Sequence, residues 1–382
     1  MNKPYLFCFL AIFSTALCIN NGVGITPPMG FNTWNHFACD IDENLAISTM
    51  DKMISLGLSD VGYEYFNLDD CWMASERNAK GELVSDSKRF PSGLKYLSDY
   101  AHKNGLKFGA YECMGTETCQ GYPGSYGHYA QDAQTFADWG LDYIKMDWCH
   151  TSDPELNPRL VYAELRDALN KTGRQIFFSI CEWGEDSPYL WGKKTGNSWR
   201  TFLDIQCSWV SVEVCVDRLM EISKYAGEGG WNDPDMLEIG NGCLSHDEEV
   251  SHFALWSITA APLIIGCDLN SIPDSSLEIL KNTEMIAVNQ DKGSVPGDCI
   301  YDLYPKQIWT RKLSDGSVAV VILNKNIFSL DFEITWEQIG LSCKTVSKLR
   351  DLVEHTTHTN VANGWTENGL KSHAVKMFRA YC

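Results

Sequence analysis

The sequence has no long hydrophobic run after its first 20 residues. The apolar run from Leu6 to Leu17 follows Lys3 and precedes two asparagines, which is the pattern of a secretory signal peptide over residues 1–19. At about a dozen residues this run is shorter than the roughly 18 that cross a bilayer. We therefore expect a protein of the secretory pathway, either secreted or delivered to a lysosome or vacuole, without a membrane span.

Basic clusters and metal-binding cysteine patterns are also missing. The formal net charge is -19, and phosphate binding depends on Lys and Arg clusters, so we expect no nucleic-acid partner. The 15 cysteines show no paired C-x-x-C spacing, and we expect neither a metal ion nor another cofactor. Cys8 and Cys18 leave with the signal peptide. The odd number that remains in an exported chain implies several disulfide bridges and at least one free thiol.

Short β-rich runs alternate with helical patterns from Gly24 to about Cys267. Glycine accepts the left-handed conformation that ends a helix, and a glycine follows each of the helical patterns at 47–56, 94–104, 130–139 and 160–172. The strand candidates are 63–68, 106–110, 143–146 and 176–180. This alternation predicts parallel strands with crossover helices. No G-x-G-x-x-G follows the first strand, which weakens a nucleotide-binding interpretation.

The ends of the strand candidates favour a closed barrel over an open sheet. Polar side chains from many strand ends meet at one point only if the sheet closes into a ring. Here they are Asp69, Asp70, Tyr111, Asp147, Cys181 and Glu182, with Asp204 and Asp235 in later segments. We therefore expect a (β/α)₈ TIM barrel over residues 20–294.

The sequence pattern changes after about Pro296. Two β-rich runs, 307–313 and 318–323, flank Asp315-Gly316, which indicates a hairpin. More such runs follow, without a long helix. We expect a C-terminal antiparallel β-sandwich domain over residues 295–382.

Asp147 ends a buried-looking strand, two residues after Lys145. A nearby ammonium group keeps a carboxylate ionised, as a nucleophile requires. Two carboxyl groups at strand ends suit the cleavage of a glycosidic bond, in which one group protonates the leaving oxygen and the other attacks or stabilises the anomeric carbon. Without other context, a structural ion pair is the alternative interpretation of Asp147.

Several motifs together resemble the α-galactosidase (melibiase) family of glycoside hydrolases, which also contains α-N-acetylgalactosaminidases. The resemblance covers essentially the whole mature chain. Its motifs are Gly24-Ile25-Thr26-Pro27-Pro28-Met29-Gly30-Phe31-Asn32-Thr33-Trp34, Asp69-Asp70-Cys71-Trp72, Gly121-Tyr122-Pro123-Gly124-Ser125, Cys181-Glu182-Trp183-Gly184 and Trp231-Asn232-Asp233-Pro234-Asp235-Met236. The fold that it implies is the barrel and sandwich expected above.

The resemblance implies a retaining hydrolase for terminal α-linked galactose, with α-galactosides as its substrates. Asp147 matches the nucleophile and Asp204 the general acid/base, with carboxyl groups about 5 Å apart. Asp69 and Asp70 match the acceptors of the sugar 4- and 6-hydroxyls. A metal site is the competing interpretation of Asp69 and Asp70, but no His or third acid lies near them in sequence, and the family needs no metal.

The other residues that the resemblance implies surround the sugar. Trp34 supplies an apolar wall, while Lys145 and Arg200 bind ring hydroxyls and hold the carboxylates ionised. Tyr111 and Asp235 are further contacts. In Cys181-Glu182-Trp183, the bulk of Trp183 and the Glu182 carboxylate leave little room for an acetamido group at carbon 2, and Cys181 is a pocket thiol.

The resemblance also implies disulfide bridges that bracket the site, Cys39 with Cys71 and Cys119 with Cys149. The sequon at Asn170 is the only N-x-S/T in the chain and predicts a glycan. Beside the nucleophile, Met146 and Trp148 depart from the family pattern, and Tyr111-Glu112-Cys113 lacks its usual small residue and Asp. Trp148 could therefore alter which aglycone is accepted.

Two other functions stay open. On the same scaffold, the enzyme could cleave a related sugar, α-N-acetylgalactosamine or β-L-arabinopyranose. A non-catalytic galactose-binding relative is the alternative from another class, and retention of both Asp147 and Asp204 speaks against it. A homodimer is open beside a monomer.

Overall fold

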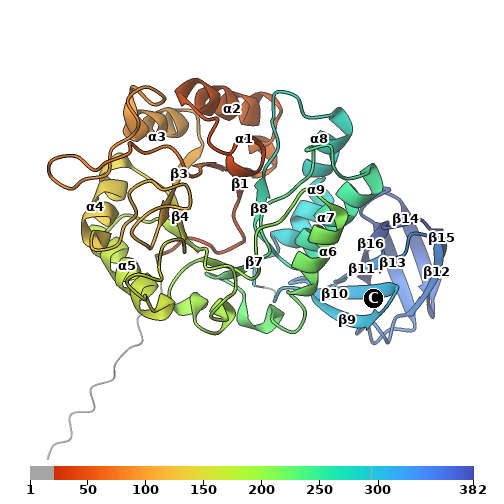
Figure 1. Cartoon of the computed structure of the whole chain (residues 1–382). Coiled ribbons are helices and arrows are strands. Elements are labelled where there is room, and N and C mark those ends of the chain that lie inside the picture. The colour runs from red at the N-terminus through yellow and green to blue at the C-terminus, as the bar shows by residue number, and fades with distance from the viewer. Residues whose placement is uncertain (1–20, 294) are drawn as a thin grey trace, which may run out of the picture.

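The structure is a computed structural model that describes residues 21–293 and 295–382. The expected signal peptide, residues 1–19, lies outside the described residues. Figure 1 shows two modules side by side, a barrel coloured red to green and a set of blue strands. In the described part of the chain, no helix combines the length and the apolarity that crossing a membrane would require.

The first module is a ring of eight parallel strands in the order β7-β6-β5-β4-β3-β2-β1-β8. A parallel bridge between Leu237 and Ile265 joins the two ends of this order and closes the ring. The expected (β/α)₈ barrel is therefore confirmed. The strands are β1 (Met29–Asn32), β2 (Tyr65–Leu68), β3 (Lys107–Cys113), β4 (Tyr143–Asp147), β5 (Phe177–Ile180), β6 (Ser198–Arg200), β7 (Trp231–Asp233) and β8 (Leu263–Ile265).

Helices cover the outside of the ring. Gly140 and Gly173 end two of them in the left-handed conformation, with φ of 78° and 75°, as the sequence predicts. The helices are α1 (Trp34–Phe37), α2 (Glu43–Ser55), α3 (Gly93–Lys103), α4 (Tyr129–Trp139), α5 (Pro158–Thr172), α6 (Trp209–Asp217), α7 (His246–Ile258), α8 (Asp274–Leu280) and α9 (Thr283–Asn289).

Side-chain caps set where several helices begin. The Asn157 side chain accepts a hydrogen bond from the Leu160 amide at the start of α5, where Pro158 fits the first turn. Ser245 and Glu248 form a reciprocal capping box at the start of α7. A cap of this kind contributes about 1 kcal/mol to stability.

The second module is the expected antiparallel β-sandwich. A six-stranded sheet in the order β14-β13-β16-β11-β10-β9 faces the two-stranded sheet β12-β15 across a separate apolar core. The strands are β9 (Asp298–Leu303), β10 (Lys306–Lys312), β11 (Val318–Asn324), β12 (Leu330–Thr335), β13 (Thr345–Asp351), β14 (Thr357–Ala362), β15 (Gly364–Leu370) and β16 (Val375–Tyr381).

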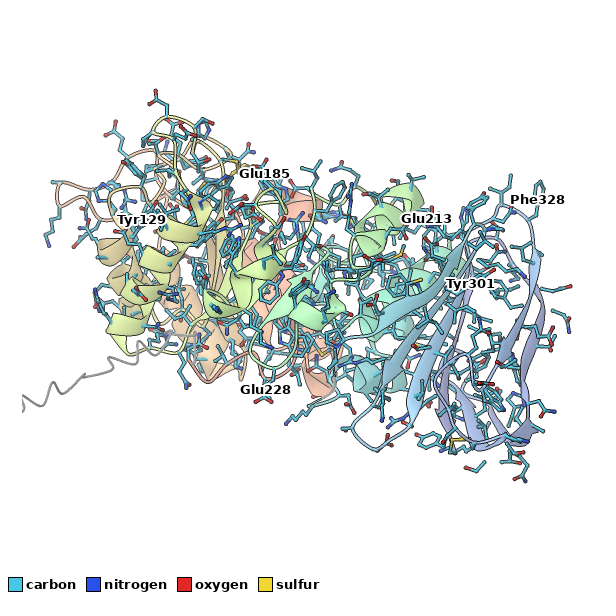
Figure 2. The ribbon with its side chains drawn as sticks, turned by 90° about the horizontal axis from the view of Figure 1, so that it is seen from below. Tyr129, Glu185, Glu213, Glu228, Tyr301 and Phe328 are labelled. Atoms are coloured by element: carbon cyan, nitrogen blue, oxygen red, sulfur yellow. A yellow bond between two sulfur atoms is a disulfide. The ribbon has the colours of Figure 1, made fainter. Side chains whose placement is uncertain are left out.

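The two modules pack through the sandwich strand β11, which is buried along its whole length. Val320 and Ile322 point into the sandwich core. Ala319, Val321 and Leu323 point the other way and belong to the same apolar cluster as the barrel core. In Figure 2 the sandwich, with Tyr301 and Phe328, lies beside the barrel.

Candidate active site

The carboxyl ends of the barrel strands surround a pocket of about 110 Å³, which we call the strand-end pocket. In Figure 2, Glu185 and Glu228 lie on opposite sides of the barrel. Glu185, in the loop after β5, marks the carboxyl ends of the strands, and Glu228, in the loop before β7, marks their amino ends. The pocket gathers nine of the sequence-predicted residues: Trp34, Asp69, Asp70, Tyr111, Lys145, Asp147, Arg200, Asp204 and Asp235.

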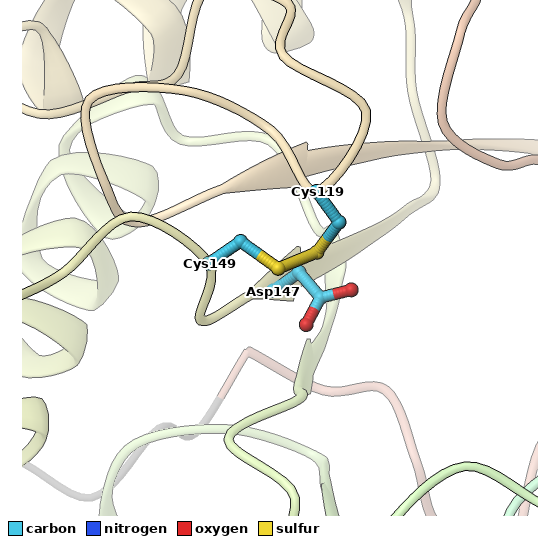
Figure 3. A group of neighbouring side chains, drawn as sticks. All are labelled: Cys119, Asp147 and Cys149. Atoms are coloured by element: carbon cyan, nitrogen blue, oxygen red, sulfur yellow. A yellow bond between two sulfur atoms is a disulfide. The ribbon is translucent and has the colours of Figure 1, made fainter.

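Asp147 is the last residue of β4 and is only 6% exposed. Its Oδ1 accepts a hydrogen bond from the Trp148 amide at 2.9 Å. Burial raises the pKa of Asp147 to about 6, although Lys145 and the Trp148 amide oppose the shift. Figure 3 shows its carboxylate beside the Cys119–Cys149 disulfide, whose sulfurs are therefore not thiolate ligands for a metal ion.

Asp204 reaches the same pocket from the loop after β6, and 57% of its side chain is exposed. Arg200 contacts its Oδ1 through Nη2 at 3.0 Å. Partial burial alone would raise the pKa of Asp204, but the charges of Arg200 and Lys145 outweigh burial and lower it. Asp204 therefore keeps its negative charge to lower pH than Asp147 does.

The two carboxyl groups titrate together, because each charge acts on the other. Because the pKa of Asp147 is raised and that of Asp204 is lowered, the first proton that the pair takes up as the pH falls favours Asp147. Asp204 takes up the second proton at lower pH. Between these two steps the pair shares a single proton, which is the state in which one group can be an acid and the other a nucleophile.

Asp69 and Asp70 follow β2 directly, and each is 1% exposed. Oδ2 of Asp69 accepts hydrogen bonds from Asn32 at 2.7 Å and from Lys145 at 3.0 Å. Oδ2 of Asp70 accepts one from the Gln120 amide at 3.0 Å. Burial raises the pKa of Asp70, which backbone donors partly oppose. Both side chains therefore have fixed orientations and can accept hydrogen bonds from hydroxyl groups.

Arg200 links the acid-rich side of the pocket. Its Nη2 contacts Oδ2 of Asp235 at 2.7 Å in addition to Asp204. Asp235 also accepts a hydrogen bond from the Ile205 amide at 2.9 Å, which holds the loop that carries Asp204. Burial alone would lower the pKa of Arg200, but the surrounding acids, first of all Asp235, raise it.

Three residues that the resemblance placed around the sugar lie elsewhere. Cys181 lines a smaller hollow of about 30 Å³ deeper in the barrel, which we call the axial hollow. Glu182 lines a separate surface hollow together with Trp148. Trp183 is half-buried and is not among the residues that line the strand-end pocket. The alternation of side chains explains the split between Cys181 and Glu182.

The strand-end pocket also contains residues to which the sequence gave no role in the site. Asn35, Ile205 and Gln206 line it, beside Cys119 of the expected bridge and Met236 of the last family motif. Asn32 stands behind Asp69 as its hydrogen-bond donor. Only convergence in space relates the segment of Asn32 and Asn35 to that of Ile205 and Gln206.

The departures from the family pattern lie behind the pocket wall. Trp148 is 8% exposed and stacks on Tyr162 with ring centroids 5.5 Å apart. Met146 is fully buried. Glu112 is also fully buried, and its Oε2 accepts a hydrogen bond from the Cys113 amide. None of the three lines the strand-end pocket.

The disulfides among the described residues are Cys39–Cys71, Cys119–Cys149, Cys207–Cys243 and Cys343–Cys382. The first two are the pairs that the resemblance implies, and the sequence left the other two unassigned. Cys181 is a free, buried thiol. These bridges fit a protein of the secretory pathway. Asn170 is exposed in the last turn of α5, where a glycan would have room.

Comparisons with known proteins agree over most of the described chain. A family described as "Alpha galactosidase A" matches residues 26–291, and "Alpha galactosidase C-terminal beta sandwich domain" matches residues 304–380. An α-galactosidase of Cyamopsis tetragonoloba is 46% identical over 359 residues, 94% of this chain and 87% of that protein.

Solved structures give the same result. α-Galactosidase I of Mortierella vinacea superposes with a TM-score of 0.89 at 35% identity, covering 94% of this chain and 98% of that one. An α-galactosidase of Saccharomyces cerevisiae with raffinose gives 0.86 at 31% identity, with the same coverage of 94% and 98%.

Proposed function

Because this chain belongs to the α-galactosidase (melibiase) family of glycoside hydrolases, we propose that Asp147 and Asp204 are the two groups that perform its reaction. The protein is a retaining glycosidase that removes terminal α-linked galactose. The observation that carries the assignment of roles is that a buried carboxylate and an exposed one share a single pocket, with their pKa values shifted in opposite directions.

In the first step, a carboxylate oxygen of Asp147 forms a bond to the anomeric carbon. The bond from that carbon to the glycosidic oxygen breaks, and Asp204 gives its proton to this oxygen, so the aglycone leaves as an alcohol. A bound substrate covers the exposed side chain of Asp204, and burial raises the pKa of a carboxyl group. Substrate binding thereby favours the protonated form of Asp204 that this step needs.

In the second step, Asp204 is a base. It takes a proton from a water molecule, whose oxygen attacks the anomeric carbon and displaces the carboxylate of Asp147. Arg200, at 3.0 Å from Asp204, stabilises the ionised form that begins this step. Two displacements at the same carbon restore the α configuration, and both acids return to their starting states.

The sugar itself is held by charged acceptors. The buried carboxylates of Asp69 and Asp70 accept hydrogen bonds from its hydroxyl groups, and such charge-assisted bonds are the stronger kind. Lys145 and Arg200 donate to ring hydroxyls, and Trp34 packs against the apolar face of the ring. A pocket of about 110 Å³ suits one terminal sugar unit.

The substrate class that follows is α-galactosyl oligosaccharides, of which raffinose is a suitable probe, as well as glycolipids and glycoproteins that end in α-galactose. We expect galactose to be preferred over N-acetylgalactosamine, because the relative of 46% identity is an α-galactosidase and the pocket of about 110 Å³ is densely lined with charged side chains. Paired assays with the 4-nitrophenyl α-glycosides of the two sugars test this preference. A faster reaction with the N-acetyl sugar would contradict it. The site of action is the secretory pathway, outside the cell or in a lysosome or vacuole.

Azide rescue separates the two catalytic roles. In Asp147→Ala, azide attacks from the side of the missing nucleophile, so the product is β-galactosyl azide. In Asp204→Ala, the galactosyl-enzyme still forms from an activated substrate, and azide then releases α-galactosyl azide. NMR of the anomeric proton identifies the product. Asp99→Ala is the control, since Asp99 lies on α3 with 61% of its side chain exposed. Full activity of Asp147→Ala without azide would disprove the assignment.

A further inference from the structure

The axial hollow lies inside the ring of strands, beneath the strand-end pocket. Its lining includes residues of β1, β2, β4, β5, β6, β7 and β8. A space that almost all strands of the ring line together must lie on the barrel axis. Lys145, Arg200, Asp235 and Met236 line both this hollow and the strand-end pocket. The two spaces are therefore separated by the side chains that the reaction uses.

The axial hollow is polar, although branched apolar side chains usually fill the interior of such a barrel. Asn67, Ser179 and Asp233 contribute to its wall, and each is at most 8% exposed. Gly109 of β3 leaves room for one of them, since a Cβ at that position would lie 2.0 Å from Oδ1 of Asn67. Buried polar groups of this kind need hydrogen-bond partners to be tolerated.

Two atoms of the residues that line the axial hollow have no such partner within the described chain. Nε of Arg200 is a buried donor and Oδ1 of Asn67 is a buried acceptor. A volume of about 30 Å³ exceeds the roughly 10–15 Å³ that one water molecule requires. Since water both donates and accepts, one molecule that lies within hydrogen-bond distance of each atom satisfies both.

Asp233 stands at the same hollow, at the end of β7. Its Oδ1 accepts a hydrogen bond from the Asp235 amide at 2.8 Å, which leaves its other oxygen for the hollow. The charged and titratable groups around Arg200 and Asp233 are Tyr143 and Lys145 on β4, Cys181 after β5, Asp204 on the loop after β6, and Asp235 after β7.

We propose that the axial hollow holds an ordered water that accepts a hydrogen bond from Nε of Arg200 and donates one to Oδ1 of Asn67, and that Asp233 is a positioning residue that acts through Arg200 on Asp204. The guanidinium group is planar, so a fixed Nε fixes the direction of the Nη2 that contacts Asp204. The role of Asp233 rests on the proposed role of Asp204 as acid/base.

A charge on Asp233 has a consequence for the catalytic pair. It compensates part of the Arg200 charge, which otherwise favours the ionised form of Asp204. Burial raises the pKa of Asp233 to about 6, against the lowering influence of Arg200, so this charge appears in the pH range where the pair loses its shared proton. In Asp233→Asn the charge never appears. The upper limb of the pH profile of kcat/KM then moves to lower pH, by about half a unit at an effective dielectric constant near 20.

Removing the side chain tests positioning directly. In Asp233→Ala, Arg200 loses the neighbouring charge of its register partner on β7, and the axial hollow widens beside it. We expect kcat to fall about tenfold on raffinose, whose leaving group needs the proton of Asp204. The loss on 4-nitrophenyl α-galactoside should be at most about twofold, because nitrophenolate leaves without a proton. A residue that only stabilises the fold would not distinguish the two substrates.

Asp132→Asn is the matched control. Asp132 is a fully buried acid of α4 that pairs with Arg77 at 2.7 Å, away from both hollows. We expect this change to lower the unfolding temperature without moving the pH limb or the ratio of the two substrates. If Asp233→Ala does not fold by circular dichroism, Asn67→Ala carries the substrate comparison, because it removes the acceptor of the water.

A crystal structure of the wild-type enzyme tests the water itself. Density for one water within hydrogen-bond distance of Arg200 Nε and Asn67 Oδ1 supports the proposal, and a dry hollow overturns it. Equal losses on the two substrates, or an unmoved pH limb in Asp233→Asn, overturn the role of Asp233. Failure of the proposed function is distinct from both, since Asp204→Ala would then hydrolyse raffinose as fast as the wild type.

Discussion

Replacing Lys145 with methionine should move the whole pH profile of the enzyme to higher pH. Lys145 is the cation that most strongly opposes the raised pKa of Asp147, and 15% of its side chain is exposed. A cation favours the ionised form of a carboxyl group. Its removal therefore raises both pKa values of the catalytic pair, including the upper one, which is about 6.

The size of the shift follows from strand geometry. Lys145 and Asp147 are two residues apart on β4 and point to the same face, which separates them by about 6.6 Å along the strand. At an effective dielectric constant of about 20, unit charges at this distance interact by about 2.5 kcal/mol. One pKa unit corresponds to about 1.4 kcal/mol, and partial exposure reduces the effect. We expect a shift of about one to two pH units.

The assay is kcat/KM for 4-nitrophenyl α-galactoside between about pH 3 and pH 9, with product measured after quenching in alkali. KM should also rise, because Asp69 loses its partner at 3.0 Å. Lys107→Met is the control, since Lys107 pairs with Glu64 at 2.6 Å at the opposite end of the barrel. A profile that stays in place, or that moves to lower pH, would refute the electrostatic role of Lys145.

Three further predictions concern the surroundings of the pocket. Trp148→Asn should keep kcat/KM within about threefold while lowering stability by about 3 kcal/mol, because it removes the stack on Tyr162 but not the amide that holds Asp147; chemical denaturation and steady-state kinetics measure the two effects. The double change Cys119→Ala and Cys149→Ala, which opens a bridge of sequence separation 30, should cost about 3 to 4 kcal/mol, and a loss below about 1 kcal/mol would contradict the estimate. Burial lowers the pKa of His252 to about 3, below the 6.5 of an unfolded chain. The stability due to neutral His252 is therefore present above about pH 6.5 and is lost as the pH falls toward 3. His252→Gln should weaken the decline in unfolding temperature over that range, and an unchanged decline would argue against this origin.

Local patterns predicted most of the fold. Glycine stops and β-rich runs located α2 to α5, β2 to β5 and the hairpin β10-β11 to within a few residues, and strand ends indicated the closed ring. The errors have physical reasons. Tyr63 is buried but lies before β2, because its amide donates to the Leu58 carbonyl at 3.2 Å and closes the preceding turn. β3 continues to Cys113, beyond its apolar run, because these residues still pair with β4.

The candidate site was predictable where residues stand at strand ends, and less so elsewhere. The residues around Cys181 matched the family motif together. Neighbouring side chains at a strand end point to different sides, however, so Glu182 faces another hollow. Asn67 and Asp233 gave no local signal of a shared space. Their relation depends on the closure of the ring, which brings β2 and β7 to one axis.

The strand β11 serves two interiors at once, since alternate side chains belong to the barrel core and the sandwich core. Separating the modules would expose Ala319, Val321 and Leu323 to water, which is unfavourable for apolar side chains. The C-terminal module therefore cannot be removed or exchanged without exposing part of the barrel core. Unfolding of the sandwich strands would also disturb α7 and the wall of the barrel. Heat should therefore unfold the two modules in a single cooperative transition.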